Sequence, residues 1–368
     1  MTFKARKDTA NTPDEDANSS SQNLWDAASD NIQERGQGHH RAVNKKVLRA
    51  EDVSTILVLG SKSGGKSTLI GRLLEKNETP KPTLALDFTF ARRTTPDLIK
   101  EVCHIWELGG DAITFSQLIE TPIKTNHALD KFSIFLVLDL SVPEKIWSTL
   151  DTTVSSAKKA LTRALADNLR SKESQDMTRK LEENIKERLG EDCQDRNQIE
   201  PFPLPLVIIC TKYDVFQNFE PEKRKLICRI LRLASHRLGA SLNFYSKHEV
   251  AHNRRARELF THSAFGTPFP KSIVQDYNKA LLIPPGGDSY DQIWPGTSPN
   301  QFSMDFFKHL FETQVGKYNE KLSIPDDPAD DANFRESDVD SRRSLILEDI
   351  ALTEKVRQEY SKADNLIL

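Results

Sequence analysis

Residues 60–67 read Gly-Ser-Lys-Ser-Gly-Gly-Lys-Ser and match the phosphate-binding pattern G-x-x-x-x-G-K-[ST] at every fixed position. The apolar run at 56–59 before the motif predicts a strand. Residues 68–74 after it predict a helix, so the motif lies between the two elements. Loop N–H groups and the helix dipole would bind phosphate oxygens there. Lys66 would reach the β and γ phosphates, and the Ser67 hydroxyl would bind Mg²⁺. The candidate phosphate-binding residues are Gly60, Ser61, Lys62, Ser63, Gly64, Gly65, Lys66, Ser67 and Thr68.

Four further segments follow in the order found in Ras-like GTPases. Residues 105–111, Ile-Trp-Glu-Leu-Gly-Gly-Asp, stand where Ras-like proteins carry I-W-D-T-A-G-Q, and residues 82–88 resemble the first switch of Rab-type GTPases. Residues 206–214 end in Thr-Lys-Tyr-Asp, which is the base-reading N-K-x-D with Thr in place of Asn, and residues 242–247 stand where the S-A-K loop is expected. The five segments together resemble a Ras-like domain over about residues 50–280.

This resemblance implies a site for GTP or GDP with Mg²⁺. The residues are equally compatible with a site that binds no nucleotide. Ser67 and Thr83 would be the Mg²⁺ ligands if a nucleotide is bound. The further candidate nucleotide-binding residues are Thr83, Glu107, Gly110, Thr211, Lys212, Asp214, Ser246 and Lys247.

Four departures from the Ras-like pattern argue against efficient hydrolysis. Glu107 is one methylene longer than the usual Asp, and Asp111 takes the place of the Gln that orients the attacking water. A carboxylate offers no amide donor, so Asp111 cannot act as that Gln. Lys62 replaces a glycine, and its stem would crowd a partner's arginine finger. Thr211 lacks the amide of Asn, whereas Asp214 could still accept hydrogen bonds from guanine. No catalytic residue is predicted.

Composition excludes several classes of protein. The chain has 368 residues, of which 29% are charged, with a formal net charge of −3, so no general basic field favours nucleic acid. The four cysteines form no C-x-x-C pair and are expected to be buried thiols in a reducing compartment. No apolar stretch approaches the ~18 residues of a membrane span, and neither a secretory signal nor a lipidation motif is recognisable. We therefore expect a soluble intracellular protein without membrane insertion.

The fold class predicted is α/β, a Ras-like P-loop domain whose six-stranded, mostly parallel sheet has helices on both faces. Five strands are expected after the first, at 83–91, 101–108, 132–140, 204–211 and 241–246. The expected organisation is a disordered N-terminus at 1–22, a short amphipathic helix and linker at 23–50 around Leu24 and Trp25, the Ras-like domain at 51–282, a connector and packing helix at 283–322, an acidic linker at 323–336 and a C-terminal helix at 337–368.

Three helical segments leave alternatives open. Residues 143–190 contain almost no helix breakers and form either one helix of about twelve turns or two helices broken near 171–174. This insert either covers the flank of the domain or braces a larger partner. The helix at 304–322, with Phe306, Phe307, Leu310 and Phe311, is expected to pack on the domain, and its Phe307 and Leu310 are also expected to contribute to contact with a partner. The helix at 337–362 either docks on a partner or folds back onto the sheet.

With these parts placed, the sequence resembles the light intermediate chains of cytoplasmic dynein, and within that family those of dynein 2. The resemblance is carried by residues 24–28, 60–67, 81–93 and 104–110 and covers about 24–320. It implies a non-catalytic accessory subunit that binds the dynein 2 heavy-chain tail, with other dynein 2 subunits and intraflagellar transport particles as further partners. It also implies retrograde transport in cilia and a location in the cytoplasm, cytoskeleton, cilium and basal body. The alternative is a regulatory Ras-like GTPase that acts as a nucleotide-dependent switch.

Overall fold

The computed structural model describes residues 53–364, apart from residues 77, 96–99, 126–128, 169–171, 192, 271, 297–303 and 319–334. The predictions for 1–22 and for the helix around Leu24 and Trp25 therefore lie outside the described residues, as does most of the predicted acidic linker.

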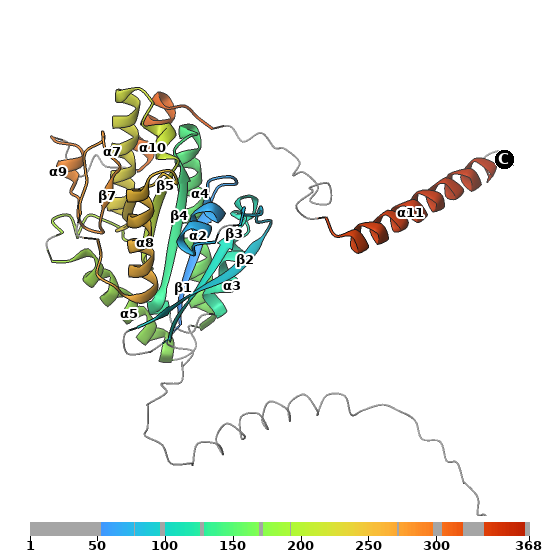
Figure 1. Ribbon diagram of the computed structural model, residues 1–368, viewed down its shortest axis with the longest axis horizontal. Helices are drawn as coiled ribbons and strands as arrows, with labels where there is room; N and C mark the ends of the chain where they lie inside the picture. Colours follow the sequence, from blue (N-terminus) through green and yellow to red (C-terminus); the bar gives the residue numbers. More distant parts are fainter. Residues whose placement is uncertain are drawn as a thin grey trace, which may run out of the picture. The chain divides into compact units, whose positions relative to one another are not determined.

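One mixed sheet forms the centre of the described domain (Figure 1). Its seven strands follow the order β2-β3-β1-β4-β5-β6-β7. All neighbouring strands are parallel except the two edge strands, because β2 pairs antiparallel with β3 and β7 pairs antiparallel with β6. The strands are β1 (Ser54–Gly60), β2 (Leu86–Thr94), β3 (Lys100–Leu108), β4 (Phe132–Asp139), β5 (Leu206–Thr211), β6 (Ser241–Phe244) and β7 (Leu282–Ile283).

The sheet is buried on both faces, as expected for parallel strands with near-continuous apolar runs. Every residue of β1, β4 and β5 is buried. Side chains alternate between the faces, so Leu57 and Leu59 belong to one core cluster and Ile56 and Val58 to the other. The first cluster includes residues of α3 (Ser116–Thr125), α4 (Pro143–Asn168), α5 (Lys172–Leu189), α7 (Pro221–Arg237) and α10 (Met304–Gln314). The second includes residues of α2 (Lys66–Leu73) and α8 (Val250–Phe265).

The predicted fold class is confirmed, but the count of six strands is wrong. All six expected strands are present, and a seventh, β7, adds two residues to the edge beside β6. A two-residue strand is too short to show the alternation by which strands are recognised in a sequence. The strand expected at 83–91 begins later, at Leu86.

The segment 143–190 forms two helices, α4 and α5, so the two-helix alternative is correct. Its apolar stripe packs inward, since Ile146, Leu150, Ala157 and Leu161 are all buried in the larger core cluster. The stripe of α4 therefore covers the flank of the domain, which leaves the polar face of the helix as the surface available to a partner.

The helix expected at 304–322 is shorter than predicted, because α10 ends at Gln314 and Gly316 follows with a φ of 120°. It packs on the domain as expected: Phe307 and Phe311 are buried, and the Phe311 ring contacts Trp147. Phe306, in contrast, is 56% exposed.

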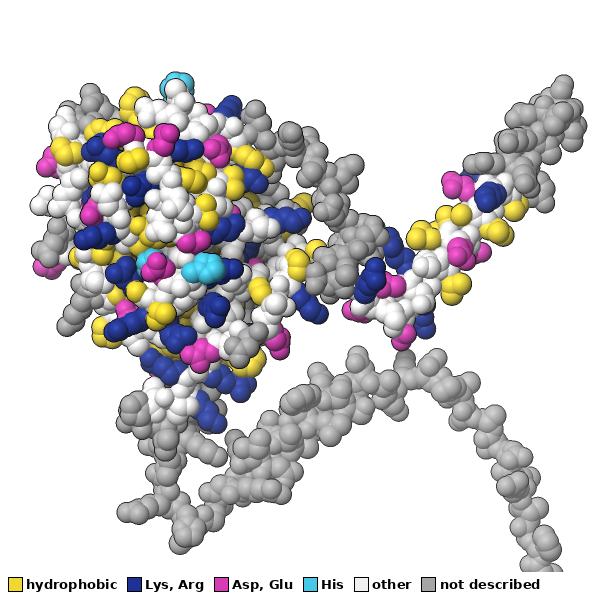
Figure 2. Space-filling model, turned by 45° about the horizontal axis from the view of Figure 1, so that its top comes forward, with side chains coloured by type: hydrophobic (Ala, Val, Ile, Leu, Met, Phe, Trp, Pro, Cys, Tyr) yellow, Lys and Arg dark blue, Asp and Glu magenta, His cyan; other side chains and the backbone are white. Residues whose placement is uncertain are grey.

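The C-terminal helix α11 (Ser337–Asp364) has apolar side chains on more than one side (Figure 2). Leu345, Ile346 and Leu347 follow one another directly and are each more than half exposed. Successive helical residues point about 100° apart, so these side chains form a broad apolar surface.

The remaining short elements join the larger ones: η2 (Gly110–Ala112), η3 (Leu129–Lys131), α6 (Tyr213–Phe216) and α9 (Tyr290–Ile293). On the face of the domain shown in Figure 2, basic and acidic side chains are interspersed. Among the helices that the structure describes, none combines the length and the apolar character needed to cross a membrane.

Candidate nucleotide-binding site

The phosphate loop lies at the carboxyl end of β1 and leads directly into α2. Three of its residues have a positive φ, Gly60 at 149°, Ser63 at 58° and Gly65 at 93°. The Gly64 N–H donates to the Ser61 carbonyl at 3.2 Å, which closes the turn. The first N–H groups of an α-helix have no hydrogen-bond acceptor within the helix, so this end of α2 can bind an anion.

Lys66 is held against the loop that precedes it. Its Nζ donates to the carbonyl oxygens of Gly60 at 3.0 Å and Ser61 at 2.9 Å, and the residue is only 5% exposed. These two bonds fix the ammonium beneath the loop, which is where the motif needs a positive charge to meet phosphate oxygens.

Ser67, Glu107 and Thr83 come together from three separate segments. Ser67 Oγ donates to Glu107 Oε1 at 2.6 Å, and the Thr83 side chain also hydrogen-bonds to Glu107. Burial raises the pKa of the Glu107 carboxyl above its usual value, although the hydrogen bond from Ser67 and the charge of Lys66 oppose that rise.

This donor set fits a hydrated Mg²⁺ accompanied by phosphates. Mg²⁺ prefers oxygen ligands, keeps several waters and binds proteins through one or two side chains plus substrate phosphates. Ser67 and Thr83 would supply hydroxyl ligands, and Glu107 would accept hydrogen bonds from bound water. The described residues contain no cluster of three or more His, Cys, Asp and Glu side chains that could hold a metal without such phosphates.

Two glycines let the turn after β3 lie directly against the phosphate loop. A Cβ on Gly110 would lie 1.9 Å from the Lys62 nitrogen, and a Cβ on Gly109 would lie 2.3 Å from the Leu84 carbonyl oxygen. The Gly109 N–H donates to the Ala85 carbonyl at 2.7 Å. The phosphate loop, the segment before β2 and the turn after β3 thus form one packed unit in which only glycine fits at these two positions.

The base-reading segment is joined to the phosphate loop by Thr211. Its Oγ1 lies 2.6 Å from the Gly64 carbonyl and 3.1 Å from the Leu138 carbonyl, and the residue is 3% exposed. Ser246 Oγ donates to Asp214 Oδ1 at 2.6 Å, so the last loop orients the carboxylate that would read guanine. The residues predicted for the base side are therefore adjacent, with Thr211 occupied as a link behind the loop.

Lys212 has a partner that was not predicted from the sequence. Its backbone adopts a left-handed φ of 59°, and its Nζ forms an ion pair with Asp139 Oδ2 at 2.6 Å. Asp139 in turn accepts from Ser141 Oγ at 2.6 Å. The available signal was the position of Asp139 at the carboxyl end of β4, beside the end of β5 in a parallel sheet.

Three predicted residues lie at the surface of the domain. The side chains of Lys62, Ser63 and Lys247 are exposed, and Lys247 accepts a hydrogen bond from Asn253 through its backbone carbonyl. Asp111 lies in η2, directly after the glycine that contacts the phosphate loop; its side chain lies outside the described residues.

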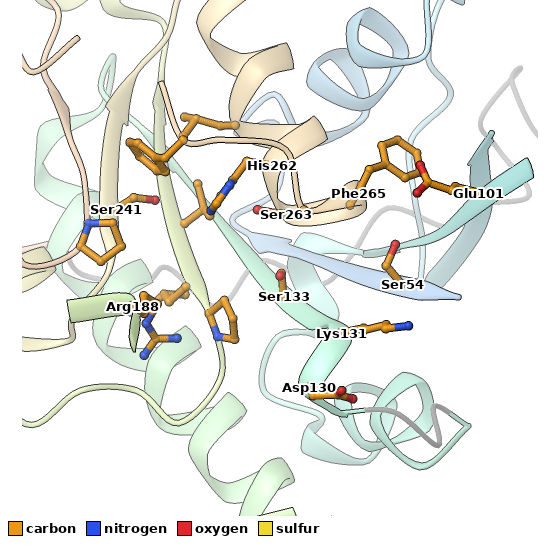
Figure 3. Close-up of a pocket in the computed structure, with 18 of the residues that line it drawn as sticks. Ser54, Glu101, Asp130, Lys131, Ser133, Arg188, Ser241, His262, Ser263 and Phe265 are labelled. Carbon is orange, nitrogen blue, oxygen red and sulfur yellow. The ribbon is translucent and has the colours of Figure 1, made fainter. Parts of the chain in front are cut away.

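A cavity of about 420 Å³ lies at the amino ends of the strands, whereas the phosphate loop lies at their carboxyl ends (Figure 3). Ser54, Ser133 and Ser241 line it, and each stands at the amino end of its strand. The phosphate loop follows the carboxyl end of β1, so this cavity is not the predicted nucleotide site.

The strand order, the phosphate loop at the end of β1 and the adjoining base-side residues define a P-loop domain of the Ras-like type. Residues 19–204 match the family described as Dynein light intermediate chain (DLIC). The chain belongs to the dynein light intermediate chain family.

Relatives and a solved structure agree with this assignment. The chain is 38% identical to the Bos taurus protein named Cytoplasmic dynein 2 light intermediate chain 1 over 88% of this chain and 92% of that protein. It is 37% identical to the Homo sapiens protein of the same name, over 93% and 97% respectively. A crystal structure of the conserved domain of a dynein light intermediate chain shares the fold, with a TM-score of 0.51 at 16% identity, over 75% of this chain and 94% of that one.

Proposed function

We propose that this protein is a non-catalytic accessory subunit of cytoplasmic dynein 2 that binds the tail of the heavy chain and supports retrograde intraflagellar transport and cilium assembly. The relatives named above support the assignment to dynein 2, since they cover almost the whole chain. The partners we propose are the heavy-chain tail, other dynein 2 subunits and intraflagellar transport particles, in the cytoplasm, cytoskeleton, cilium and basal body.

The observation that carries the non-catalytic part is the carboxylate of Asp111 at the position of the Gln that orients the attacking water. Asp111 has no amide with which to orient water, whereas the pairing of Ser67 with Glu107 is compatible with Mg²⁺ and phosphate. A site of this kind can hold a nucleotide without turning it over at a useful rate. A bound nucleotide would then stabilise the folded domain by mass action, as a structural ligand.

The assembly role requires apolar surface beyond what a Ras-like domain uses internally. An obligate contact with a heavy chain would bury more than about 2,000 Å². The described residues offer such surface on α11 and at Phe306, which are exposed, whereas Phe307 and Phe311 belong to the core. Our expectation that Phe307 contributes to a partner surface is therefore wrong, because it packs inside the domain.

One observation favours the regulatory-GTPase alternative. Thr83 lies close enough to hydrogen-bond to Glu107, which is where a switch residue that senses Mg²⁺ and the γ-phosphate would lie. A switch, however, would also need hydrolysis or exchange to reset it.

The nucleotide recovered from purified protein separates the two functions. The protein is denatured, the released nucleotide is identified by chromatography, and the same preparation is incubated with GTP to measure turnover. We expect either GDP at up to one molecule per chain or an empty site, with no appreciable turnover. Lys66→Ala protein serves as the control for loss of the site. Bound GTP that is hydrolysed and exchanged would instead support the switch.

A further inference from the structure

The outer strand β2 has an edge that no other described strand pairs with. It pairs only with β3, through nine consecutive residue pairs from Leu86↔Leu108 to Thr94↔Lys100, with no bulge. Edge strands are normally shortened, bulged or interrupted by proline, because a long regular edge pairs with other chains. β2 contains no proline, so it retains a regular nine-residue edge.

The same strand exposes aromatic side chains. Phe88 and Phe90 are each 45% exposed and lie on one face of the sheet. The Phe88 ring contacts Trp106 at 4.7 Å and His104 at 5.2 Å between ring centroids, and the Arg92 guanidinium lies 4.5 Å from the centre of the Phe90 ring. This aromatic surface continues to the free edge of the sheet.

Backbone geometry shows which residues could pair outward. The Gly109 N–H donates to the Ala85 carbonyl, so odd-numbered residues of this segment direct their backbone groups toward β3. The even-numbered residues therefore direct both N–H and C=O to the free edge. These are Leu86, Phe88, Phe90, Arg92 and Thr94.

The sequence of β2, Leu-Asp-Phe-Thr-Phe-Ala-Arg-Arg-Thr, is complementary to itself when two copies run antiparallel. Full overlap of the nine residues places Phe90 opposite Phe90 on a two-fold axis. In that register Phe88 lies opposite Arg92, and Asp87 lies opposite Arg93. Aromatic pairs, cation–aromatic pairs and opposite charges across strands are each stabilising.

We propose that the β2 edge is a self-association surface, at which two copies of this chain join antiparallel around Phe90 and their sheets become continuous. The interface is isologous, as closed two-fold dimers require. The Lys76 ammonium lies 3.1 Å from Thr89 Oγ1 at an exposed position, so it can move aside at the cost of that bond. One strand pair buries less than the about 1,600 Å² of a standard interface, so the dimer is expected to be weak and reversible.

Sedimentation of the full chain tests the proposal from about 1 µM to about 200 µM, a range that covers weak association. We expect a reversible dimer that Phe90→Lys abolishes, because two ammonium groups would then face each other on the axis. Asp87→Asn should weaken it several-fold. Val250→Lys is the matched control, since Val250 is 84% exposed on α8 and should leave the dimer intact. A protein that stays monomeric throughout, or a dimer that survives Phe90→Lys, overturns the proposal.

Cross-linking gives a second measurement should Phe90→Lys fail to fold. Opposed residues that exchange hydrogen bonds lie about 5.5 Å apart between Cα atoms, within the range of a disulfide. All four native cysteines are buried and unpaired, so an introduced cysteine would be the one exposed thiol among the described residues. Phe90→Cys should form covalent dimers on mild oxidation, much faster than Val250→Cys. Equal rates for the two variants would overturn the proposal, as would a dimer that disappears only when 337–368 is deleted.

Discussion

Ser67 and Glu107, forty residues apart in the sequence, are joined by a 2.6 Å hydrogen bond between the phosphate loop and the end of β3. The bond places a buried carboxylate directly beside the hydroxyl that would bind Mg²⁺. Burial disfavours the ionised carboxylate unless a cation or hydrogen-bond donors compensate. The stability of the domain should therefore depend on what occupies this site.

Glu107→Gln should stabilise the nucleotide-free protein at neutral pH. The folded-state pKa of Glu107 is raised above the ordinary 4.5, so the folded state binds a proton more tightly than the unfolded state. The contribution of Glu107 to the free energy of unfolding is therefore fully present below pH 4.5, and it decreases as the pH rises from 4.5 through the raised pKa of the folded state. Gln can still accept the Ser67 hydrogen bond, and it removes the cost of the buried charge. We expect a gain of about 1 kcal/mol at pH 7 in urea unfolding.

The same gain should shrink toward zero well below pH 4.5, where the carboxyl is protonated in both states. Glu78→Gln makes the same substitution at an exposed carboxylate, so it serves as the control and should change stability little. A loss of stability for Glu107→Gln at pH 7 without nucleotide would contradict this electrostatic interpretation.

Lys66→Ala should abolish nucleotide binding. The ammonium is the positive charge held beneath the loop, and its loss also leaves the carbonyl oxygens of Gly60 and Ser61 without their donor. We expect at least a 100-fold weaker affinity in titrations with a fluorescent guanine nucleotide, and a destabilisation of about 1–3 kcal/mol. Lys76→Ala removes an exposed ammonium and should have neither effect. Unchanged nucleotide affinity in Lys66→Ala would remove the site assignment.

Thr211→Val should weaken the link between β5 and the phosphate loop. Valine keeps the shape but leaves the buried Gly64 carbonyl without its partner at 2.6 Å. A buried acceptor that loses its partner costs about 1–3 kcal/mol, measurable by urea unfolding. The same substitution at Thr162, whose hydroxyl makes an exposed bond within α4, should cost clearly less. Equal costs at the two sites would show that the Thr211 bond contributes nothing specific.

Intrinsic GTP hydrolysis should be no faster than that of an unassisted Ras-like protein, on the order of 10⁻⁴ s⁻¹. The reason is the carboxylate at position 111, which cannot orient water as an amide does. A single-turnover assay measures the rate directly. Rates above roughly 10⁻² s⁻¹, the level of a G protein with its own arginine in place, would refute the non-catalytic interpretation.

The sequence predicted the core of the fold because its strands are continuous buried runs. β1, β4 and β5 are buried throughout, and each was identified within two residues of its observed start or end. The strand β7 has only two residues, too few to show the alternation of apolar and polar side chains that predicts a strand. Phe306 and Phe307 are adjacent and equally apolar, so the sequence could not tell that one is exposed and the other buried.

The sequence predicted which residues form the candidate site better than it predicted the hydrogen bonds and ion pairs between them. Motif order placed Ser67, Glu107 and Thr211 at strand ends, but their mutual bonds depend on side-chain positions across the fold. The bond from Thr211 to Gly64 spans 147 residues, and the ion pair from Lys212 to Asp139 spans 73. Contacts between residues this far apart have no recognisable pattern in the local sequence.

We expect the chain to work by assembly through its exposed apolar additions and not through nucleotide-sensing switches. Co-purification with the dynein 2 heavy-chain tail tests it most directly, with Phe306→Lys, a chain that lacks 337–368, and Thr83→Ala compared in parallel. Phe306 is 56% exposed, so its replacement should not unfold the domain, unlike a charge at Phe307. We predict that the first two variants lose most of the heavy chain while Thr83→Ala retains it. Full recovery of the heavy chain with the first two and loss with Thr83→Ala would contradict the claim and establish the switch instead.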